Sequence, residues 1–193
     1  MATLKSTKRL LLHAGVFFAF LLFSSQAFPL NDKFDDSFRK WNAYYTPELP
    51  WYWLKSQAYI ESALNPSAES PVGAKGISQF LDSTWGDMRE QLSLTVDQYN
   101  ADAAIQAQAY YMRQLRSTWT RYGRSQCEIH NLALASYNAG TGNILKAQEK
   151  SGGERYWRDI NPHLYKVTGD HHKETIGYVE RFWRTVKRIL NGE

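Results

Sequence analysis

The chain has 193 residues, of which 43% are hydrophobic, 15% aromatic and 22% charged, with 23 basic residues against 19 acidic ones. This length suits one globular domain, and the hydrophobic and aromatic content excludes an intrinsically disordered chain. A single cysteine, Cys127, excludes an internal disulfide framework and a cysteine-based zinc site. We expect it to be a buried thiol, and the alternative is pairing with a second molecule.

The first 27 residues have the three-part pattern of a signal peptide. Basic residues near the start precede an apolar run over residues 10–23, which is short for a membrane span, and small residues then suit a signal peptidase. We therefore predict export to the periplasm, with cleavage after Ala27; the alternative is an uncleaved inner-membrane anchor over residues 10–28. Cleavage leaves 20 basic against 19 acidic residues. Without a basic patch interleaved with aromatics, we expect no nucleic-acid partner.

Beyond the leader, apolar residues recur at helical spacing and strand patterns are nearly absent. The sequence predicts an irregular, partly helical lead-in over residues 28–49 and one mostly α-helical domain over residues 50–193. The predicted helices cover residues 51–64, 76–91, 101–122, 126–139, 142–149 and 173–190. A polar stretch over residues 150–172 is predicted to be irregular. In the last helix the predicted inward stripe consists of Ile176, Val179, Trp183, Val186 and Leu190.

One carboxylate interrupts an apolar stripe. In the helix predicted over residues 51–64, Glu61 shares a face with apolar residues such as Ile60. Burial there raises the pKa of a carboxyl group and keeps it protonated near neutral pH, as a general acid requires. On periodicity alone, an equally open alternative is that Glu61 reaches solvent or pairs with Lys75 or Arg89.

The loop after this helix carries a longer motif. Residues 61–80 read ESALNPSAESPVGAKGISQF. They resemble the catalytic signature of soluble lytic transglycosylases, members of the goose-type lysozyme superfamily, which reads E-S-x-(aromatic or apolar)-N-P-x-A-x-S-x-x-G-A-x-G-(apolar)-x-Q. Two further blocks follow in the expected order. Residues 135–140, ASYNAG, resemble A-Y-N-A-G with an inserted Ser, and residues 174–179, ETIGYV, resemble E-T-x-x-Y-V.

The resemblance implies an all-α, lysozyme-like domain with a cleft for cell-wall glycan and one catalytic carboxyl group, Glu61. In the family this residue protonates the β-1,4 glycosidic oxygen between N-acetylmuramic acid and N-acetylglucosamine. It then takes the proton from the muramic C6 hydroxyl, which closes a 1,6-anhydro ring. Most glycosidases need a second carboxylate, but an intramolecular hydroxyl removes that need. The implied activity is that of a peptidoglycan lytic transglycosylase, with no cofactor.

The resemblance also implies substrate contacts in the loop, each with a structural alternative. Ser70 matches a serine that bonds near the substrate N-acetyl group, and otherwise caps a turn. Gln79 matches a glutamine that contacts sugar, and is otherwise exposed to solvent. The loop departs from the family at Ile77-Ser78, which stands where relatives have Leu-Met, so one apolar contact with sugar is in doubt.

Three further residues in the later blocks are implied to contact substrate. Tyr137 and Asn138 match the second block, although Tyr137 also fits a plain core position. Tyr178 lies off the apolar stripe of the last helix. Its hydroxyl can orient Glu61 there, and the alternative is that its ring only packs against the core. Ile176 stands where many relatives have Arg, which alters contacts at the edge of the cleft.

Two other functions stay open at this point. A lysozyme-type hydrolase on the same fold needs a positioned water and a second carboxylate, for which Glu69, Asp82 and Asp102 are the nearby candidates. A glycan-binding assembly protein would hold glycan strands without cutting them.

The implied partners are peptidoglycan glycan strands, and membrane contact is expected only through an uncleaved leader. The small size of the chain is compatible with a role in a secretion, conjugation or phage machine. It is equally compatible with general turnover of the cell wall. The pair His171-His172 beside Glu174 matches no standard ligand spacing, so we expect no metal site.

Overall fold

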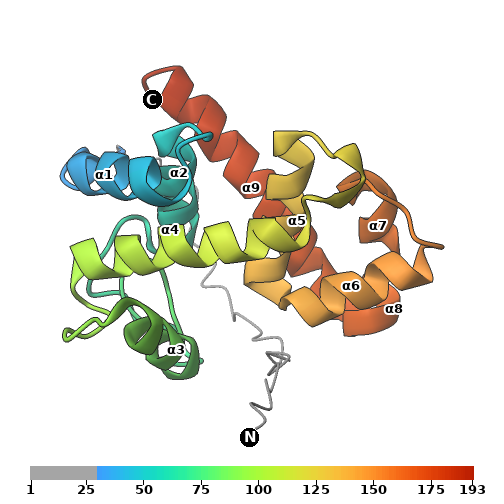
Figure 1. Ribbon diagram of the computed structural model, residues 1–193, viewed down its shortest axis with the longest axis horizontal. Coiled ribbons are helices and arrows are strands. Elements are labelled where there is room, and N and C mark those ends of the chain that lie inside the picture. The colour runs from blue at the N-terminus through green and yellow to red at the C-terminus, as the bar shows by residue number, and fades with distance from the viewer. Residues whose placement is uncertain (1–29) are drawn as a thin grey trace, which may run out of the picture.

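The computed structural model describes residues 30–193 (Figure 1), so the predicted leader and its cleavage point lie outside the described residues. Helices make up the regular structure of this part, and its extended backbone is limited to two isolated bridges at Lys75, with Glu69 and with Phe80. The predicted all-α fold is therefore confirmed. None of the helices within residues 30–193 combines the length and the apolar character that crossing a bilayer requires.

The α-helices of the described chain follow in order: α1 (Asp35–Tyr45), α2 (Trp51–Ser62), α3 (Asp82–Leu92), α4 (Ala101–Thr118), α5 (Gln126–Ala139), α6 (Thr141–Lys150), α7 (Trp157–Ile160), α8 (Tyr165–Thr168) and α9 (His172–Leu190). Short 3-10 turns lie between them: η1 (Arg121–Gly123), η2 (Asn161–His163) and η3 (Gly169–His171).

The helices form two groups joined by the longest ones. In Figure 1, α1 to α3 lie on one side and α5 to α8 on the other, while α4 and α9 run between them. Helix α9 packs against both α2 and α5, and α1 packs against α2 and α4. Helix α9 therefore joins the two groups through its contacts with α2 and α5.

Each group has its own buried apolar cluster. The first lies among α1 to α4 and includes Phe38, Ile77, Trp85 and Ile105. The second lies among α4 to α9, together with Trp53 of α2, and includes Leu132, Ile144, Ile160 and Phe182. The partly buried rings of Tyr111 and Tyr137 pack against both clusters, so these two tyrosines link the halves of the domain.

Several predicted boundaries were wrong. Helix α3 begins at Asp82 rather than at residue 76, because Gly76 and Gln79 adopt positive φ angles that a helix cannot contain. Helix α4 ends at Thr118, before the left-handed residue Tyr122. The stretch over residues 150–172, predicted as irregular, contains short helices.

Two predictions about burial were also wrong. In α9 the predicted stripe is too narrow: Val179 and Val186 are buried, and Ile176 and Trp183 pack against the same cluster. The buried face also includes residues that the prediction left out, namely Thr175, Tyr178, Phe182 and Thr185. Leu190, at the end of the predicted stripe, is exposed. Cys127 is an exposed free thiol rather than a buried one, because it lies in the first turn of α5, away from the packed face of that helix.

Candidate active site

Glu61 lies in the last turn of α2, where the helix meets the loop that carries the longest sequence motif. The helix stops there because Ala63 and Leu64 both adopt left-handed backbone angles. Ser62 then fastens the helix end to the loop, since its hydroxyl donates to the carbonyl of Ile77 at 2.8 Å. The carboxyl group of Glu61 is thus held on a fixed helix end and is half-buried.

The hydroxyl of Tyr178 donates a hydrogen bond to Oε1 of Glu61. The same hydroxyl accepts a hydrogen bond from Nε2 of Gln57 at 3.3 Å. Gln57 lies one turn before Glu61 on α2, and both Gln57 and Tyr178 are buried. The two helices thus hold one oxygen of the carboxyl group in a defined position.

Burial raises the pKa of Glu61 from 4.5 to about 8. Desolvation of the charged form is the largest cause, and the negative charge of Glu174 adds to it. The hydrogen bond from Tyr178 and the positive charge of Arg181 act in the opposite direction without cancelling the effect of burial. Glu61 is therefore a protonated acid at neutral pH, as the stripe position predicted.

A second carboxyl group lies near this acid. Glu174, in the first turn of α9, is half-buried, and its pKa is raised, chiefly by desolvation. Asn138 stabilises it by a side-chain hydrogen bond, and the amide oxygen of Asn138 accepts a hydrogen bond from the Thr175 hydroxyl at 2.8 Å. Asn138 thus connects the second and third sequence blocks and helps to position Glu174.

Tyr137 also belongs to this cluster. Its hydroxyl donates to the carbonyl of Ser78 at 2.7 Å, and both burial and the nearby charge of Glu61 raise the pKa of this phenol. The side chain of Ser78, at the position where relatives have Met, is fully buried and donates to Gln108 at 2.9 Å. Ser78 therefore faces the interior of the domain.

The other two predicted site residues organise the loop itself. The Ser70 hydroxyl accepts a hydrogen bond from the Ala74 amide at 2.9 Å, which is the turn-capping contact named as its structural alternative. The Gln79 side chain is buried, and its amide donates to the carbonyls of Gly76 at 2.9 Å and Ala68 at 3.3 Å. No hydrogen bond joins Ser70 or Gln79 to Glu61 in the described chain; both shape the loop that follows it.

Neither proposed partner of Glu61 pairs with it. The Lys75 ammonium binds the carboxylate of Asp82 at 2.9 Å, and the Arg89 guanidinium donates to the carbonyl of Leu94 at 3.4 Å. The hydrogen bond to Glu61 comes instead from Tyr178 of α9.

The three candidate second carboxylates are engaged elsewhere. Glu69 accepts from the Tyr99 hydroxyl at 3.2 Å, and Asp82 binds Lys75 and Gln98. Asp102 accepts hydrogen bonds from the Ser37 hydroxyl at 2.8 Å and from the Trp41 indole at 3.0 Å, both on α1. None of the three contributes to the pKa shift of Glu61, whereas Glu174 does.

Sequence reasoning missed three members of the cluster as site residues: Gln57, Glu174 and Arg181. Gln57 stands one helical turn before Glu61, and Glu174 opens the third sequence block. Arg181 follows Tyr178 by three residues, which puts both side chains on one face of the last helix. This spacing is the signal in the sequence that could have identified Arg181. Three large aromatic side chains, Trp53, Trp85 and Trp157, are buried and pack in the core rather than offering a surface for stacking against sugar.

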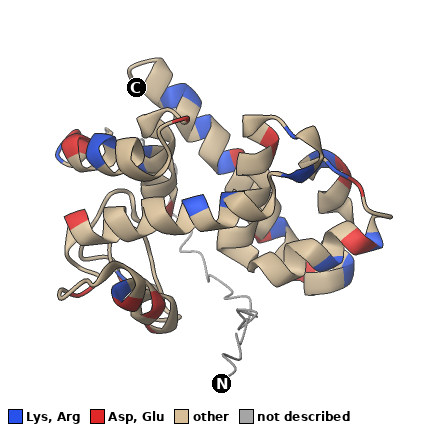
Figure 2. Ribbon diagram, viewed as in Figure 1, with Lys and Arg blue, Asp and Glu red and all other residues tan. Residues whose placement is uncertain are grey.

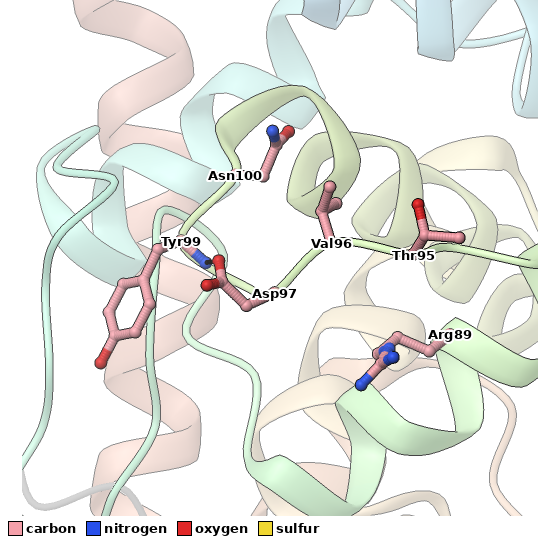
Figure 3. Close-up of a pocket in the computed structure, with 6 residues that line it drawn as sticks. All are labelled: Arg89, Thr95, Val96, Asp97, Tyr99 and Asn100. Atoms are coloured by element: carbon pink, nitrogen blue, oxygen red, sulfur yellow. Dashed lines mark hydrogen bonds between the residues drawn. The ribbon is translucent and has the colours of Figure 1, made fainter.

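An open hollow of about 650 Å³ lies away from Glu61, between α3 and the start of α4. Figure 3 shows its lining side chains, which are Arg89, Thr95, Val96, Asp97, Tyr99 and Asn100. Asp97 and Asn100 have local structural roles there, accepting hydrogen bonds from the backbone amides of Tyr99 and Ala103. Among residues 30–193, no three His, Cys, Asp or Glu side chains are grouped so that they can hold a metal ion.

The chain was compared with known protein families and with related proteins. The model of the transglycosylase SLT domain matches residues 38–160. The chain is 31% identical over 162 residues to membrane-bound lytic murein transglycosylase F of Haemophilus influenzae (strain PittEE), covering 76% of this chain and 32% of the relative. The protein of the same name from Actinobacillus pleuropneumoniae serotype 5b is 28% identical over 166 residues, with the same coverage. The chain thus spans about a third of the length of these relatives.

Solved structures agree on the fold. The 70 kDa soluble lytic transglycosylase of Escherichia coli superposes with a TM-score of 0.65 at 21% identity, covering 85% of this chain and 25% of that one. An inactive mutant of the lytic transglycosylase Slt from Pseudomonas aeruginosa gives the same TM-score at 20% identity, covering 84% of this chain. With the family model covering more than half of its residues, this chain belongs to the transglycosylase SLT domain family.

Proposed function

We propose that this chain is a peptidoglycan lytic transglycosylase. It cleaves the β-1,4 bond between N-acetylmuramic acid and N-acetylglucosamine without water and leaves 1,6-anhydromuramoyl ends. The observation that carries the proposal is Glu61, a half-buried acid with a pKa of about 8 that Tyr178 holds by a hydrogen bond, in a chain of the SLT family.

Glu61 acts in both halves of the reaction. As the neutral acid it gives its proton to the glycosidic oxygen while the bond from C1 to that oxygen breaks. As the resulting carboxylate it takes the proton of the muramic C6 hydroxyl, whose oxygen forms the new bond to C1. The proton returns to Glu61, so the residue ends the cycle as it began.

The contact with Tyr178 supports this assignment. Because the Tyr178 hydroxyl donates to Oε1 of Glu61, the acid proton is left on Oε2. The hydrogen bond also fixes the carboxyl plane, which favours proton transfer in a defined direction. When Glu61 becomes a carboxylate, the same hydrogen bond strengthens, since its acceptor is then charged.

The surroundings of Glu61 favour this reaction over hydrolysis. Glu69, Asp82 and Asp102, the candidates for activating a water, are bound to other partners. A single acid suffices when a substrate hydroxyl replaces water. Glu174 is the carboxyl group whose charge reaches Glu61, so it is the residue to test if hydrolysis is found.

We further propose that the chain is exported and acts on wall glycan in the periplasm. The leader pattern supports export, and the relatives are named as membrane-bound lytic transglycosylases of murein, which supports wall glycan as the substrate. N-terminal sequencing of the protein from the periplasmic fraction tests both export and cleavage after Ala27.

The activity test is digestion of purified peptidoglycan by the full chain beside its Glu61→Gln variant, with the muropeptides identified by mass spectrometry. We expect anhydro-muropeptides from the wild type and none from the variant. Reducing-end products would replace the proposal with hydrolysis. Retained glycan binding without any product would replace it with the role of a glycan-binding assembly protein.

A further inference from the structure

A glycine in the middle of α9 makes room for a charged side chain. Gly177 lies one residue before Tyr178, in a helical interior where glycine is the least favourable residue other than proline. A Cβ atom built at this position would lie 3.1 Å from Nη1 of Arg181, closer than ordinary van der Waals contact. The Arg181 guanidinium therefore lies back over the Gly177 backbone, one turn towards the start of the helix.

This places Arg181 on the helix face that serves the site. Glu174, Tyr178 and Arg181 follow one another at spacings of four and three residues, so they share that face. Arg181 is half-buried, and Tyr178 beside it donates its hydroxyl to Glu61. From this face the positive charge of the guanidinium reaches Glu61 at the end of α2.

The other ionisable groups around Glu61 carry no positive charge. Tyr137 faces it from α5, and Glu174 and Tyr178 face it from α9. Among the groups that act on Glu61 in the described chain, Arg181 is the cation. Further basic residues continue along α9 towards its end (Figure 2), of which Arg184 acts on Arg181, while His171 acts on Glu174.

We propose that Arg181 is a positioning residue for the transglycosylase reaction: its guanidinium, seated over Gly177, stabilises the carboxylate that Glu61 becomes after proton transfer. This inference rests on the proposed function. Glu61 loses its proton to the glycosidic oxygen as the bond to C1 breaks, and a negative charge appears on a half-buried carboxyl group. A fixed cation nearby stabilises that charged state more than the neutral acid, so it accelerates the chemical step.

The same cation also sets the pH range of the acid. Arg181 lowers the pKa of Glu61, which desolvation has raised. Removing the cation therefore raises the pKa and moves the alkaline limb of the pH profile upward, while it slows the chemistry. A residue with a merely structural role would lower activity at every pH without moving the limb.

The test compares pH profiles of kcat and kcat/KM on purified peptidoglycan for Arg181→Met and Arg181→Lys in the full chain. For Arg181→Met we expect the alkaline limb to rise by about one pH unit and kcat to fall about tenfold, with little change in KM. Arg181→Lys keeps the charge and is expected to restore most of the kcat. The matched control is Arg184→Met, which removes the same charge from an exposed position on the same helix.

A second pair of variants tests the role of Gly177. Gly177→Leu pushes the guanidinium aside without removing its charge, and leucine is a better helix former than glycine. We therefore expect a shift in the same direction as for Arg181→Met, with no loss of thermal stability. Its control is Gly86→Leu, in α3, where an added Cβ meets no atom within 4 Å.

An unmoved alkaline limb in both Arg181→Met and Gly177→Leu would overturn the proposal. Equal shifts of the alkaline limb in Arg184→Met would also overturn it.

A readout without catalysis separates this proposal from the proposed function. The carboxyl carbon of Glu61 is labelled with ¹³C, its signal is assigned by comparison with Glu61→Gln, and its pKa is measured by NMR titration. If the wild type cuts no glycan, the function fails. A higher Glu61 pKa in Arg181→Met would still support the role of Arg181, and an unchanged pKa would overturn it.

Discussion

The hydroxyl of Tyr178 on α9 donates a hydrogen bond to the carboxyl group of Glu61, which lies 117 positions earlier at the end of α2. Because Gln57 donates to the same hydroxyl, one tyrosine oxygen joins two helices and orients the acid. The contact therefore has a structural and a chemical role at once, and the two roles can be separated by measurement.

Tyr178→Phe removes the hydroxyl and keeps the buried ring. We expect kcat on peptidoglycan to fall about 10- to 100-fold, because the carboxylate formed at Glu61 loses its donor. The free energy of unfolding should fall by only about 1 to 3 kcal/mol, since the buried amide of Gln57 loses its acceptor. Urea unfolding and initial rates measure the two effects. Tyr156→Phe, at an exposed tyrosine, is the control, and an equal loss of activity there would contradict the assignment.

The raised pKa of Glu61 also predicts how stability depends on pH. The pKa is about 8 in the folded chain and 4.5 as the model value for an exposed carboxyl group. Between these values the folded state binds more protons than the unfolded state, so the stability that Glu61 contributes is lost as pH rises through 8.

A comparison with Glu61→Gln isolates this effect from other titrating groups. Relative to the variant, the wild type should lose about 3 kcal/mol of unfolding free energy between pH 4.5 and pH 9, since each pKa unit corresponds to about 1.4 kcal/mol and partial exposure reduces the full effect. Urea unfolding across this range provides the measurement. A constant difference between the two proteins would mean that Glu61 titrates normally. The activity of the wild type should fall over the same range, with its alkaline limb near pH 8.

Local signals predicted some elements correctly. Helix α5 covers Gln126–Ala139 as predicted, because the Ser125 hydroxyl caps the Glu128 amide at 3.3 Å and Gly140 ends the helix at a φ of 83°. The protonated state of Glu61 also followed from one observation, a carboxylate within an apolar stripe. These features depend on a few neighbouring residues, so the sequence contains them.

Other features depend on contacts between distant segments. The stripe predicted for α9 was too narrow, because the helix packs against both α2 and α5 and therefore also buries the adjacent face with Tyr178 and Phe182. Glu174 and Arg181 are charged residues that the pattern alone would place in solvent. Their burial follows from how α9 crosses α2 and α5. Sequence reasoning therefore found the carboxyl group whose pKa burial raises and missed the charged residues that act on it.

The loop after α2 depends on close contact at one glycine. Gly76 has a φ of 75°, and a Cβ there would lie 2.0 Å from the carbonyl oxygen of Gln98. Gly73 has a similar φ of 80° but no atom within 4 Å of the added Cβ. Gly73→Ala should therefore cost about 1 to 2 kcal/mol, the usual penalty for a left-handed alanine. Gly76→Ala should cost about 3 kcal/mol or more, because a backbone must also move.

Thermal unfolding of the two variants measures the difference in stability between them. Their activities on peptidoglycan give a second comparison. Because the loop carries Ser70 and Gln79, its displacement in Gly76→Ala should lower the rate on peptidoglycan more than Gly73→Ala does. Equal costs at the two positions would show that strain in the backbone angle, rather than contact with Gln98, explains the glycine at position 76.

A buried ion pair attaches α1 to α2. The Lys55 ammonium lies 2.6 Å from the carboxylate of Asp35, and the Lys55 side chain is only 5% exposed. Asp35→Asn leaves a buried charge without its partner, so the free energy of unfolding should fall by about 3 kcal/mol. In contrast, Lys40 and Asp102 form an exposed pair at 3.5 Å, and Lys40→Met should cost less than about 1 kcal/mol.

The double variant Asp35→Asn with Lys55→Met separates pairing from other effects of the substitution. A methionine fills the space of the lysine stem without a charge, so the double variant should recover most of the stability that Asp35→Asn loses. Denaturant unfolding of the single and double variants gives the coupling energy between the two residues. If Asp35→Asn cost no more than Lys40→Met, water would reach Lys55. The attachment of α1 would then depend on apolar contacts such as those of the fully buried Phe38.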